Sequence, residues 1–177
     1  MSFFDKAFER TIVIEKGYVF DKDDKGGETN FGITVALARF YGYTGPMKDM
    51  SISFAKTVYE KEFWEKNKLE QIALIGSDIA IDLFDAMVNC GSFNPAKWIQ
   101  TGLNTLNRQA SLYPNIIVDG VIGKGTIEAL KQLPKSDIDC LHKIIGAMRV
   151  CYYVGLNTRD ESQEKFIRGW LNRVRFQ

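Results

Sequence analysis

The sequence predicts a mainly α protein with one small β-hairpin. Its apolar residues recur mostly at helical spacing, and no run has the length and alternation of a long sheet strand. The chain has 177 residues, of which 45% are hydrophobic and 25% charged. A chain of this size and composition forms one domain with a substantial core, or one domain with a small appendage.

Charge and hydropathy exclude several classes of function. The formal net charge is only +1, which gives no overall basic field, so we expect no nucleic-acid partner. The chain lacks a run of about 18 apolar residues, so we expect no stable membrane insertion. Charges interrupt the apolar residues of the first ten positions without a small-residue cleavage site, which argues against a secretory signal.

The three cysteines, Cys90, Cys140 and Cys151, are odd in number and widely spaced. This pattern indicates reduced core cysteines and synthesis in the cytoplasm. A substrate outside the cytoplasm would then require a partner for export.

The N-terminal half predicts three helices around one loop. Residues 2–16 carry an apolar stripe at i, i+3 and i+4, and a second helical pattern begins at Ile33. Residues 51–67 form a third helix, for which Ser51 is a suitable N-cap. Between the first and second helices, glycines interrupt any helical or strand period. Short extended pieces around 18–20 and 29–32 in this stretch predict the hairpin.

The second half predicts five more helices. The first begins at Ser77 or Asp78 and ends at Gly91, and it is apolar almost all round, as expected at the centre of a core. The others cover 95–107, a short stretch that Pro134 stops, a long stretch from Ser136 or Asp137 to about 155, and 162–176. Basic residues near the end are spaced as on a solvated helix face, namely Lys165, Arg168, Arg173 and Arg175.

Residues 14–34 contain an acidic loop with three aspartates, a cluster that needs a cation, a buried partner or a chemical role. With Asp21 at position one of an EF-hand loop, Asp23 falls at position three and Gly26 at position six. Position twelve, which must supply a bidentate glutamate, is Gly32. The pattern disfavours calcium, and no Cys or His pair has zinc-ligand spacing, so we expect no bound metal.

Two further motifs have an ordinary structural interpretation. The single histidine, His142, lies in an apolar helical run, and no motif brings a Ser or Cys nucleophile to it. The stretch Gly123-Lys124-Gly125-Thr126 looks like the end of a phosphate loop but lacks the glycine required four residues before the Gly-Lys pair. We interpret it as a tight entry into a helix.

Carboxylate chemistry is the remaining interpretation of the acidic loop. Glycoside hydrolysis needs an acid that protonates the leaving oxygen, and usually a second group that activates water or stabilises the cationic sugar. Glu15 ends an apolar run, where burial favours the protonated form, and Gly17 allows close approach of a substrate. Asp24 or Asp21 would act from the wetter loop. On spacing alone, a solvated Glu15 and turn-capping aspartates remain an open alternative.

Longer motifs point to a family. Glu15-Lys16-Gly17-Tyr18, with Asp24-Lys-Gly-Gly-Glu-Thr29-Asn-Phe-Gly-Ile-Thr34, resembles the opening motif of glycoside hydrolase family 108, whose fold is similar to phage lysozymes. Asp85-Ala-Met-Val-Asn89-Cys-Gly91 looks like the family's Asp-x-x-x-Asn-x-Gly helix end. Val118-Asp119-Gly120-Val-Ile-Gly123-Lys-Gly-Thr126 looks like its C-terminal peptidoglycan-binding segment, and Gly169-Trp-Leu-Asn-Arg-Val174 matches its closing helix.

The resemblance implies a lysozyme-like N-acetylmuramidase that cleaves the β-1,4 bond between N-acetylmuramic acid and N-acetylglucosamine, without a cofactor. It places the general acid at Glu15, and it places Asp24, with Thr29, on the opposite face of the sugar. Three further residues become candidates for contacts with sugar hydroxyls and acetamido groups, namely Tyr18, Asn30 and Asn89. Lys16 stands where the family usually has glycine, and its charge would lower the pKa of Glu15 if it turned towards the acid.

The resemblance also implies an organisation and a setting. Residues 1–93 would form the catalytic domain, and 94–177 a helical peptidoglycan-binding subdomain that completes the cleft. The substrate would be peptidoglycan glycan strands in the cell wall, reached through a holin or a secretion system, as for a phage endolysin or a secretion-associated lysozyme. The alternative is a non-catalytic wall-binding or assembly module with the same fold.

Two further expectations concern the chemistry and the core. The nine-residue gap between Glu15 and Asp24 crosses a loop, which favours a wide carboxyl separation and an inverting reaction. Trp64 and Trp170 are interpreted as core residues, not as platforms for sugar rings.

Overall fold

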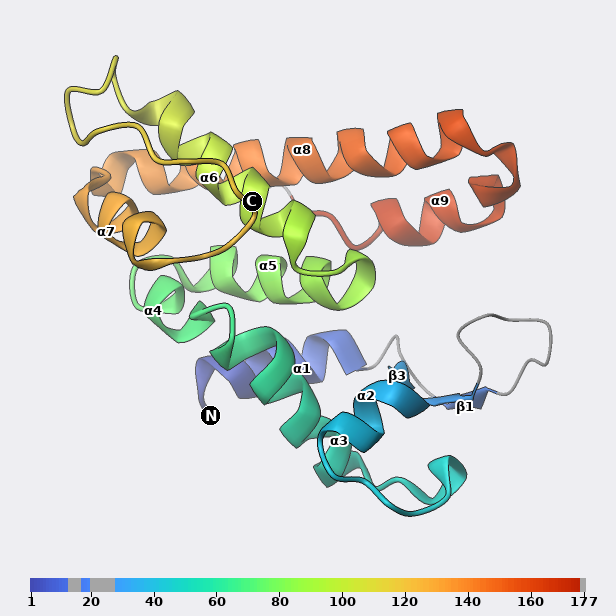
Figure 1. Cartoon of the computed structure of the whole chain (residues 1–177). Coiled ribbons are helices and arrows are strands. Elements are labelled where there is room, and N and C mark those ends of the chain that lie inside the picture. Colours follow the sequence, from blue (N-terminus) through green and yellow to red (C-terminus); the bar gives the residue numbers. More distant parts are fainter. Residues whose placement is uncertain (13–16, 20–27, 176–177) are drawn as a thin grey trace. The chain divides into compact units, whose positions relative to one another are not determined.

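The computed structural model describes residues 1–12, 17–19 and 28–175, and this part of the chain is mainly helical, as predicted (Figure 1). The chain divides into two compact units, Met1–Lys66 and Asn67–Gln177. The boundary predicted between residues 93 and 94 lies inside the second unit. The assignment of catalytic and binding roles to 1–93 and 94–177 stays a prediction.

The first unit combines short helices with a small antiparallel sheet. Helix α1 (Phe3–Ile12) precedes the strands β1 (Tyr18–Val19), β2 (Thr29–Asn30) and β3 (Ile33–Thr34), which pair in that order. The unit continues with α2 (Val35–Phe40), a 3₁₀ turn (Met47–Asp49), α3 (Ile52–Tyr59) and a π-helical continuation (Glu60–Glu65). The predicted hairpin is therefore present, with an additional strand.

The start of α2 differs from the prediction. Ile33 and Thr34, expected to begin a helix, are extended and form β3. The reason is that Thr34 is the N-cap of α2, and its hydroxyl accepts a hydrogen bond from the Leu37 N–H at 3.3 Å. Ser51 caps α3 in the same way, through the Phe54 N–H at 3.2 Å, as the sequence predicted.

Aromatic side chains form much of the core of the first unit. Phe4 lies 5.8 Å from Phe8 and 5.7 Å from Trp64 between ring centroids, and Phe8 lies 5.7 Å from Tyr59. Such tilted and edge-on pairs add to the free energy gained by burying the rings. Trp64 is buried, which confirms its interpretation as a core residue.

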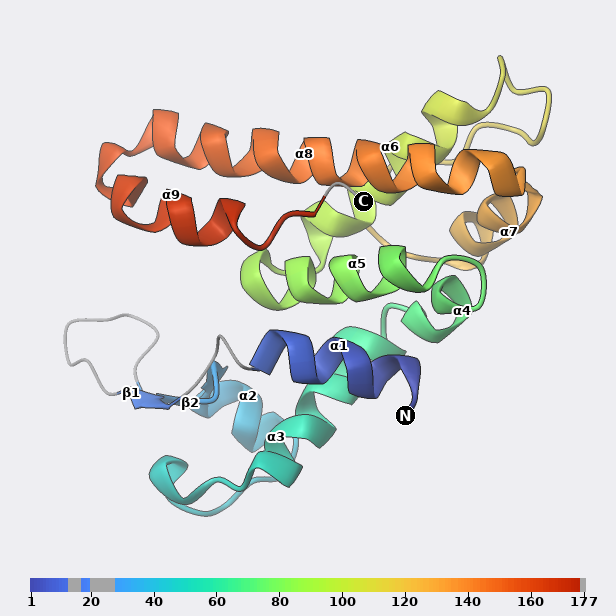
Figure 2. The same ribbon diagram turned by 180° about the vertical axis from the view of Figure 1, so that it is seen from behind.

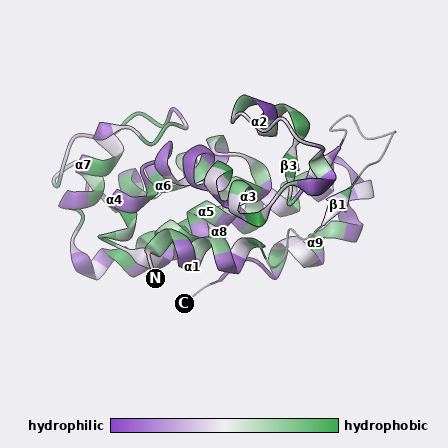
Figure 3. Ribbon diagram, turned by 90° about the horizontal axis from the view of Figure 1, so that it is seen from below, coloured by the Kyte–Doolittle hydropathy of each residue, from purple (hydrophilic) through white to green (hydrophobic). Residues whose placement is uncertain are grey.

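The second unit is a bundle of helices, seen from behind in Figure 2. Its helices are α4 (Leu69–Ala73), α5 (Ser77–Cys90), α6 (Phe93–Leu106), α7 (Lys124–Gln132), α8 (Ile138–Arg159) and α9 (Glu164–Leu171). The prediction missed α4, because five residues are too few to show a helical period. Helices such as α7 and α9 carry both hydrophilic and hydrophobic residues (Figure 3).

Helix α5 is the central helix of this unit, as its nearly continuous apolar pattern predicted. It packs against α4, α6 and α8, and nine of its residues are buried. Its N-cap is Gly76, not Ser77 or Asp78, and no side chain bonds to its first N–H groups. It ends at Gly91, as predicted, where a φ of 78° favours glycine. Across the described ranges, no helix is long and apolar enough to cross a membrane.

Candidate active site

The turn between β2 and β3 gives a physical reason for the motif around Thr29. Its two central residues, Phe31 and Gly32, have φ angles of 51° and 72°, which is the backbone of a two-residue hairpin turn. A phenylalanine is rarely found at positive φ, so neighbouring groups must hold it there. The Tyr59 hydroxyl donates to the Phe31 carbonyl at 2.6 Å, and the Phe31 N–H donates to the Gly17 carbonyl at 3.3 Å.

The register of the sheet separates the predicted site residues. Tyr18 pairs with Asn30, and Val19 pairs with Thr29. Residues directly opposite in antiparallel strands share a face, so Thr29 and Tyr18 lie on opposite faces of the sheet. Asn30 also pairs with Ile33, which is buried, so the face of Thr29 is the one turned away from the core.

Asn30 has a structural role. It is only 4% exposed, and its Nδ2 donates to the Met47 carbonyl at 2.7 Å. This bond fastens β2 to the 3₁₀ turn and engages the amide nitrogen of the side chain that was expected to contact sugar. The predicted direct contact between Asn30 and substrate is therefore not supported by the position of its side chain.

Thr29 and Tyr18 differ in what they offer a ligand. Thr29 is half-buried, and within the described ranges its side chain makes no hydrogen bond. Tyr18 is 45% exposed, and a hydrogen bond between its hydroxyl and Glu28 raises its pKa. The hydroxyl of Thr29 is thus the more available group of the two.

The two predicted catalytic carboxylates, Glu15 and Asp24, lie outside the described residues, as do Lys16 and Asp21. Their roles, and the carboxyl separation that would decide between inversion and retention, stay predictions. Among the residues that are described, no group of three or more His, Cys, Asp or Glu side chains could hold a metal ion.

Asn89 belongs to a buried polar network in the second unit. Asp85 of α5 accepts hydrogen bonds from Arg149 of α8 and from Arg173, which follows α9. Arg149 Nε donates to the Tyr153 hydroxyl at 2.9 Å, and this hydroxyl donates to Asn89 Oδ1 at 2.8 Å. The network joins the end of α5 to α8 and to the C-terminal segment.

This network gives each named residue of the Asp-x-x-x-Asn-x-Gly motif a structural role. Asp85 anchors two arginines, Asn89 receives the Tyr153 hydroxyl, and Gly91 ends the helix. Burial raises the pKa of Tyr153 to about 12, so its hydroxyl keeps its proton and remains a donor. The sequence interpretation of Arg173 as part of a solvated face is wrong, because its guanidinium is buried against Asp85.

A second network organises the segment that resembles the peptidoglycan-binding motif. Gln100 of α6 is buried, and its Nε2 lies within hydrogen-bond distance of Asp119 Oδ1, the Val121 carbonyl and Thr126 Oγ1. Its Oε1 accepts from the Gly120 N–H at 2.9 Å. The hydrogen bond from Gln100, together with one from the Val121 N–H, lowers the pKa of Asp119. Nothing in the sequence around Gln100 indicated this role.

The glycines of this segment also have structural causes. Gly120 has a φ of 79°, and a Cβ there would come 2.5 Å from the Phe93 ring. Gly123 is the N-cap of α7, which confirms the predicted tight helix entry and the place of Thr126 inside the helix. Beside them lies a hollow of about 380 Å³ with an apolar rim, in which Ile117 is 80% exposed.

His142 is a buried helix residue with a carboxylate partner. Its Nε2 lies 2.6 Å from Asp82 Oδ2, and both side chains are about nine-tenths buried. His142 lies inside α8, as the sequence interpretation of an ordinary helix histidine predicted. The partner was not predicted, since 60 residues separate the two along the chain.

Comparisons with known proteins agree with the two motif groups. Residues 8–91 match the family model described as Glycosyl hydrolase 108, and residues 94–175 match a Predicted Peptidoglycan domain. No curated protein matches the sequence. Among solved structures, SagA from Brucella abortus is similar, with 24% identity and a TM-score of 0.72, over 97% of this chain and 88% of that chain. This likeness confirms the predicted fold, which is mainly helical and lysozyme-like with a small sheet.

Proposed function

We propose that this chain, which belongs to the glycosyl hydrolase 108 family and carries a peptidoglycan domain, is an N-acetylmuramidase. The two domains make it a lysozyme-like glycoside hydrolase whose substrate is peptidoglycan. The bond that we propose it cleaves is the β-1,4 linkage from N-acetylmuramic acid to N-acetylglucosamine. The observation that carries the proposal is the family match over residues 8–91, which include both Glu15 and Asp24.

In the proposed reaction, Glu15 is the general acid. It donates its proton to the glycosidic oxygen as the bond to the anomeric carbon breaks, so the leaving sugar departs as an alcohol. A water molecule attacks the anomeric carbon from the opposite face, and Asp24 accepts its proton. The configuration at that carbon is inverted, and each carboxyl group returns to its starting state by exchange with solvent.

Thr29 is proposed to help hold the attacking water with Asp24. Two observations support this role. Thr29 lies on the face of the sheet that is turned away from the core, and its side chain makes no hydrogen bond within the described ranges. Tyr18 stays a candidate for packing against a sugar through its exposed ring. Asn30 is proposed to act indirectly, by ordering β2. Asn89, which is half-buried and accepts from Tyr153 through Oδ1, stays a candidate for contact with a sugar.

The site of action follows from the substrate. Peptidoglycan lies in the cell wall, so the enzyme acts there, and we propose that a holin or a secretion system releases it. Co-expression with and without a holin would test this route, with cell lysis as the measurement. Lysis that needs the holin supports it, and equal lysis without the holin contradicts it.

The test of the enzyme proposal compares loss of turbidity of purified cell walls between wild type, Glu15→Gln and Glu9→Gln. Removal of a general acid slows hydrolysis by about 10²–10⁴-fold, so the first variant should be nearly inactive. Glu9 is an exposed glutamate of α1 and serves as the matched control with unchanged activity. Equal clearing by Glu15→Gln and wild type would remove Glu15 as the acid, and no clearing by folded wild type would contradict hydrolysis.

A further inference from the structure

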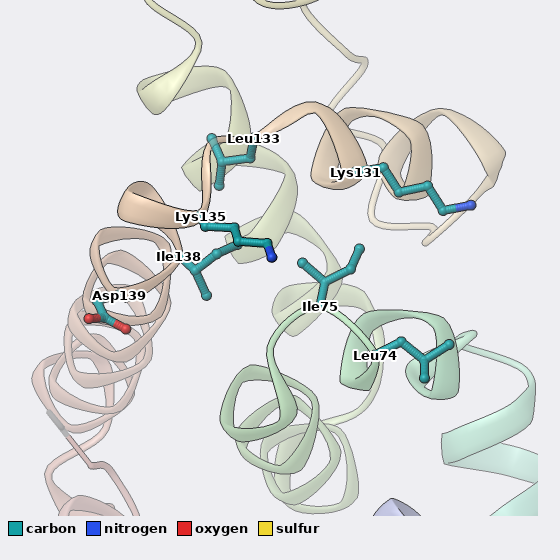
Figure 4. A pocket seen from close by; sticks show the side chains of 7 residues that line it. All are labelled: Leu74, Ile75, Lys131, Leu133, Lys135, Ile138 and Asp139. Carbon is teal, nitrogen blue, oxygen red and sulfur yellow. The ribbon is translucent and has the colours of Figure 1, made fainter.

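A hollow of about 500 Å³ lies in the second unit between the end of α4, the end of α7 and the start of α8 (Figure 4). Four apolar side chains form most of its wall, namely Leu74, Ile75, Leu133 and Ile138. Two lysines and one aspartate complete it, with Lys131 and Asp139 at opposite ends and Lys135 extending towards the middle (Figure 4).

Two smaller hollows adjoin the first and extend it in both directions. One, of about 280 Å³, shares Lys131 and adds Lys68 and Lys124 together with the carboxylate of Glu128. The other, of about 320 Å³, shares Ile138 and Asp139 and adds a second aspartate, Asp78, at the start of α5. The three together are called the basic groove below. Its continuity suits a short extended chain better than a compact ligand.

The charges of the basic groove are available for a ligand. Within the described ranges, Lys68, Lys131 and Lys135 form no ion pair, and Lys124 has only a loose one, at 3.6 Å, with Glu128. Leu74 is 72% exposed at the edge of the apolar wall. An apolar wall beside three lysines without an ion pair in the described ranges fits a ligand that carries both small apolar groups and carboxylates.

The lining also argues against a sugar as the occupant of the main hollow. None of its seven lining residues is aromatic or carries a hydroxyl or amide side chain. Glycans offer hydroxyl and acetamido groups that such side chains would have to meet. The hollow beside Gln100 and Thr126 does carry such polar groups.

We propose that the basic groove binds the acidic stem peptide of peptidoglycan, which rests on the proposed function because that function supplies the substrate. The stem peptide is short and bears alanine methyl groups, free carboxylates and, in diaminopimelate-containing walls, one amine. Its carboxylates would pair with Lys131 and Lys135, its methyl groups would cover Leu133 and Ile138, and its amine would face Asp139. The second unit thus contributes recognition of the peptide, while hydrolysis acts on the glycan.

The test measures the Kd of full-length protein for the soluble tripeptide L-alanyl-γ-D-glutamyl-diaminopimelate by NMR titration. The variant Lys131→Gln/Lys135→Gln should weaken binding by about tenfold, since it removes two exposed charge contacts. Binding by wild type should also weaken with added salt. The control is Lys143→Gln/Lys165→Gln, which makes the same change in net charge at exposed lysines outside the groove.

A second variant tests the apolar wall without a risk to folding. Leu74→Ser changes a side chain that is mostly exposed, and it should also weaken tripeptide binding. The assignment would be overturned if both groove variants kept the wild-type affinity, or if the control variant weakened binding equally. It would also be overturned if binding were lost in Val121→Ser, a variant of the hollow beside Gln100, and not in the groove variants. No tripeptide binding by wild type would overturn it as well.

A parallel assay separates this proposal from the proposed function. Peptide-free glycan strands should be hydrolysed at equal rates by wild type and Lys131→Gln/Lys135→Gln. Tripeptide binding without any glycan hydrolysis would contradict the proposed enzyme but leave the peptide site in place. Glycan hydrolysis without tripeptide binding would contradict the peptide site but leave the proposed enzyme in place.

Discussion

Substitution of Asp85 by asparagine tests the buried network that holds α5, α8 and the C-terminal segment together. The Asp85 side chain is 2% exposed and that of Arg149 is 3% exposed, so the pair is shielded from water. Asparagine keeps the shape and one acceptor oxygen but removes the negative charge. Arg149 and Arg173 would then lie buried beside a neutral amide.

The expected cost follows from this burial. Removal of one partner of a buried ion pair costs about 3–5 kcal/mol, because the remaining charge loses its counter-charge and cannot regain water. Since asparagine can still accept one hydrogen bond, we expect a loss near the lower limit, about 3 kcal/mol. A loss of this size is a large part of the stability of a domain.

The assay is equilibrium unfolding in urea followed by circular dichroism, with Asp137→Asn as the matched control. Asp137 also binds an arginine, Arg108, at 3.0 Å, but the Arg108 side chain is 56% exposed, so its loss should cost about 0–1 kcal/mol. A cost below about 1 kcal/mol for Asp85→Asn, or one equal to that of the control, would refute the reasoning.

Three more predictions follow from individual side chains. Gly120→Ala should destabilise the protein by about 1–3 kcal/mol in urea unfolding, because its Cβ would collide with the Phe93 ring; an unchanged midpoint would contradict this. Cys140 and Cys151 are exposed, so the sequence interpretation of core cysteines is wrong for these two. Iodoacetamide at pH 8 should label both but not Cys90, since burial raises the pKa of Cys90 to about 11; three labels per native chain would contradict this. Tyr153 has a folded-state pKa of about 12 against 10.0 in the unfolded chain. Its contribution to the free energy of unfolding is therefore complete below pH 10 and is lost as pH rises to 12. Unfolding followed between pH 9 and 12 should therefore show a steeper loss in wild type than in Tyr153→Phe, and equal slopes would count against it.

Local signals in the sequence were sufficient for most of the fold. The apolar stripe of α1, the capping serine of α3 and the all-round hydrophobicity of α5 each depend on residues close in the chain. The errors lie where local patterns are weak. Thr34 was assigned to a helix although its hydroxyl caps that helix from a strand, and α4 is too short to have a period.

Contacts between distant segments could not be predicted from the sequence. The pairing of Asp85 with Arg173 joins residues 88 positions apart, and Arg173 alone looked like one more surface charge. Gln100 is a polar residue in an apolar helix, and only the fold shows that it holds Gly120 and Thr126. The available Thr29 and the structural Asn30 are neighbours in one motif, and the sheet register separates their roles.

The identity of the new reducing end tests the central claim most directly. Products of wild-type digestion of purified peptidoglycan are reduced with borohydride and analysed by mass spectrometry. Hydrolysis of the proposed bond predicts N-acetylmuramic acid, as its alcohol, at every new end, with no such ends produced by Glu15→Gln. Reduced N-acetylglucosamine, or products with an anhydro end that resists reduction, would contradict the account.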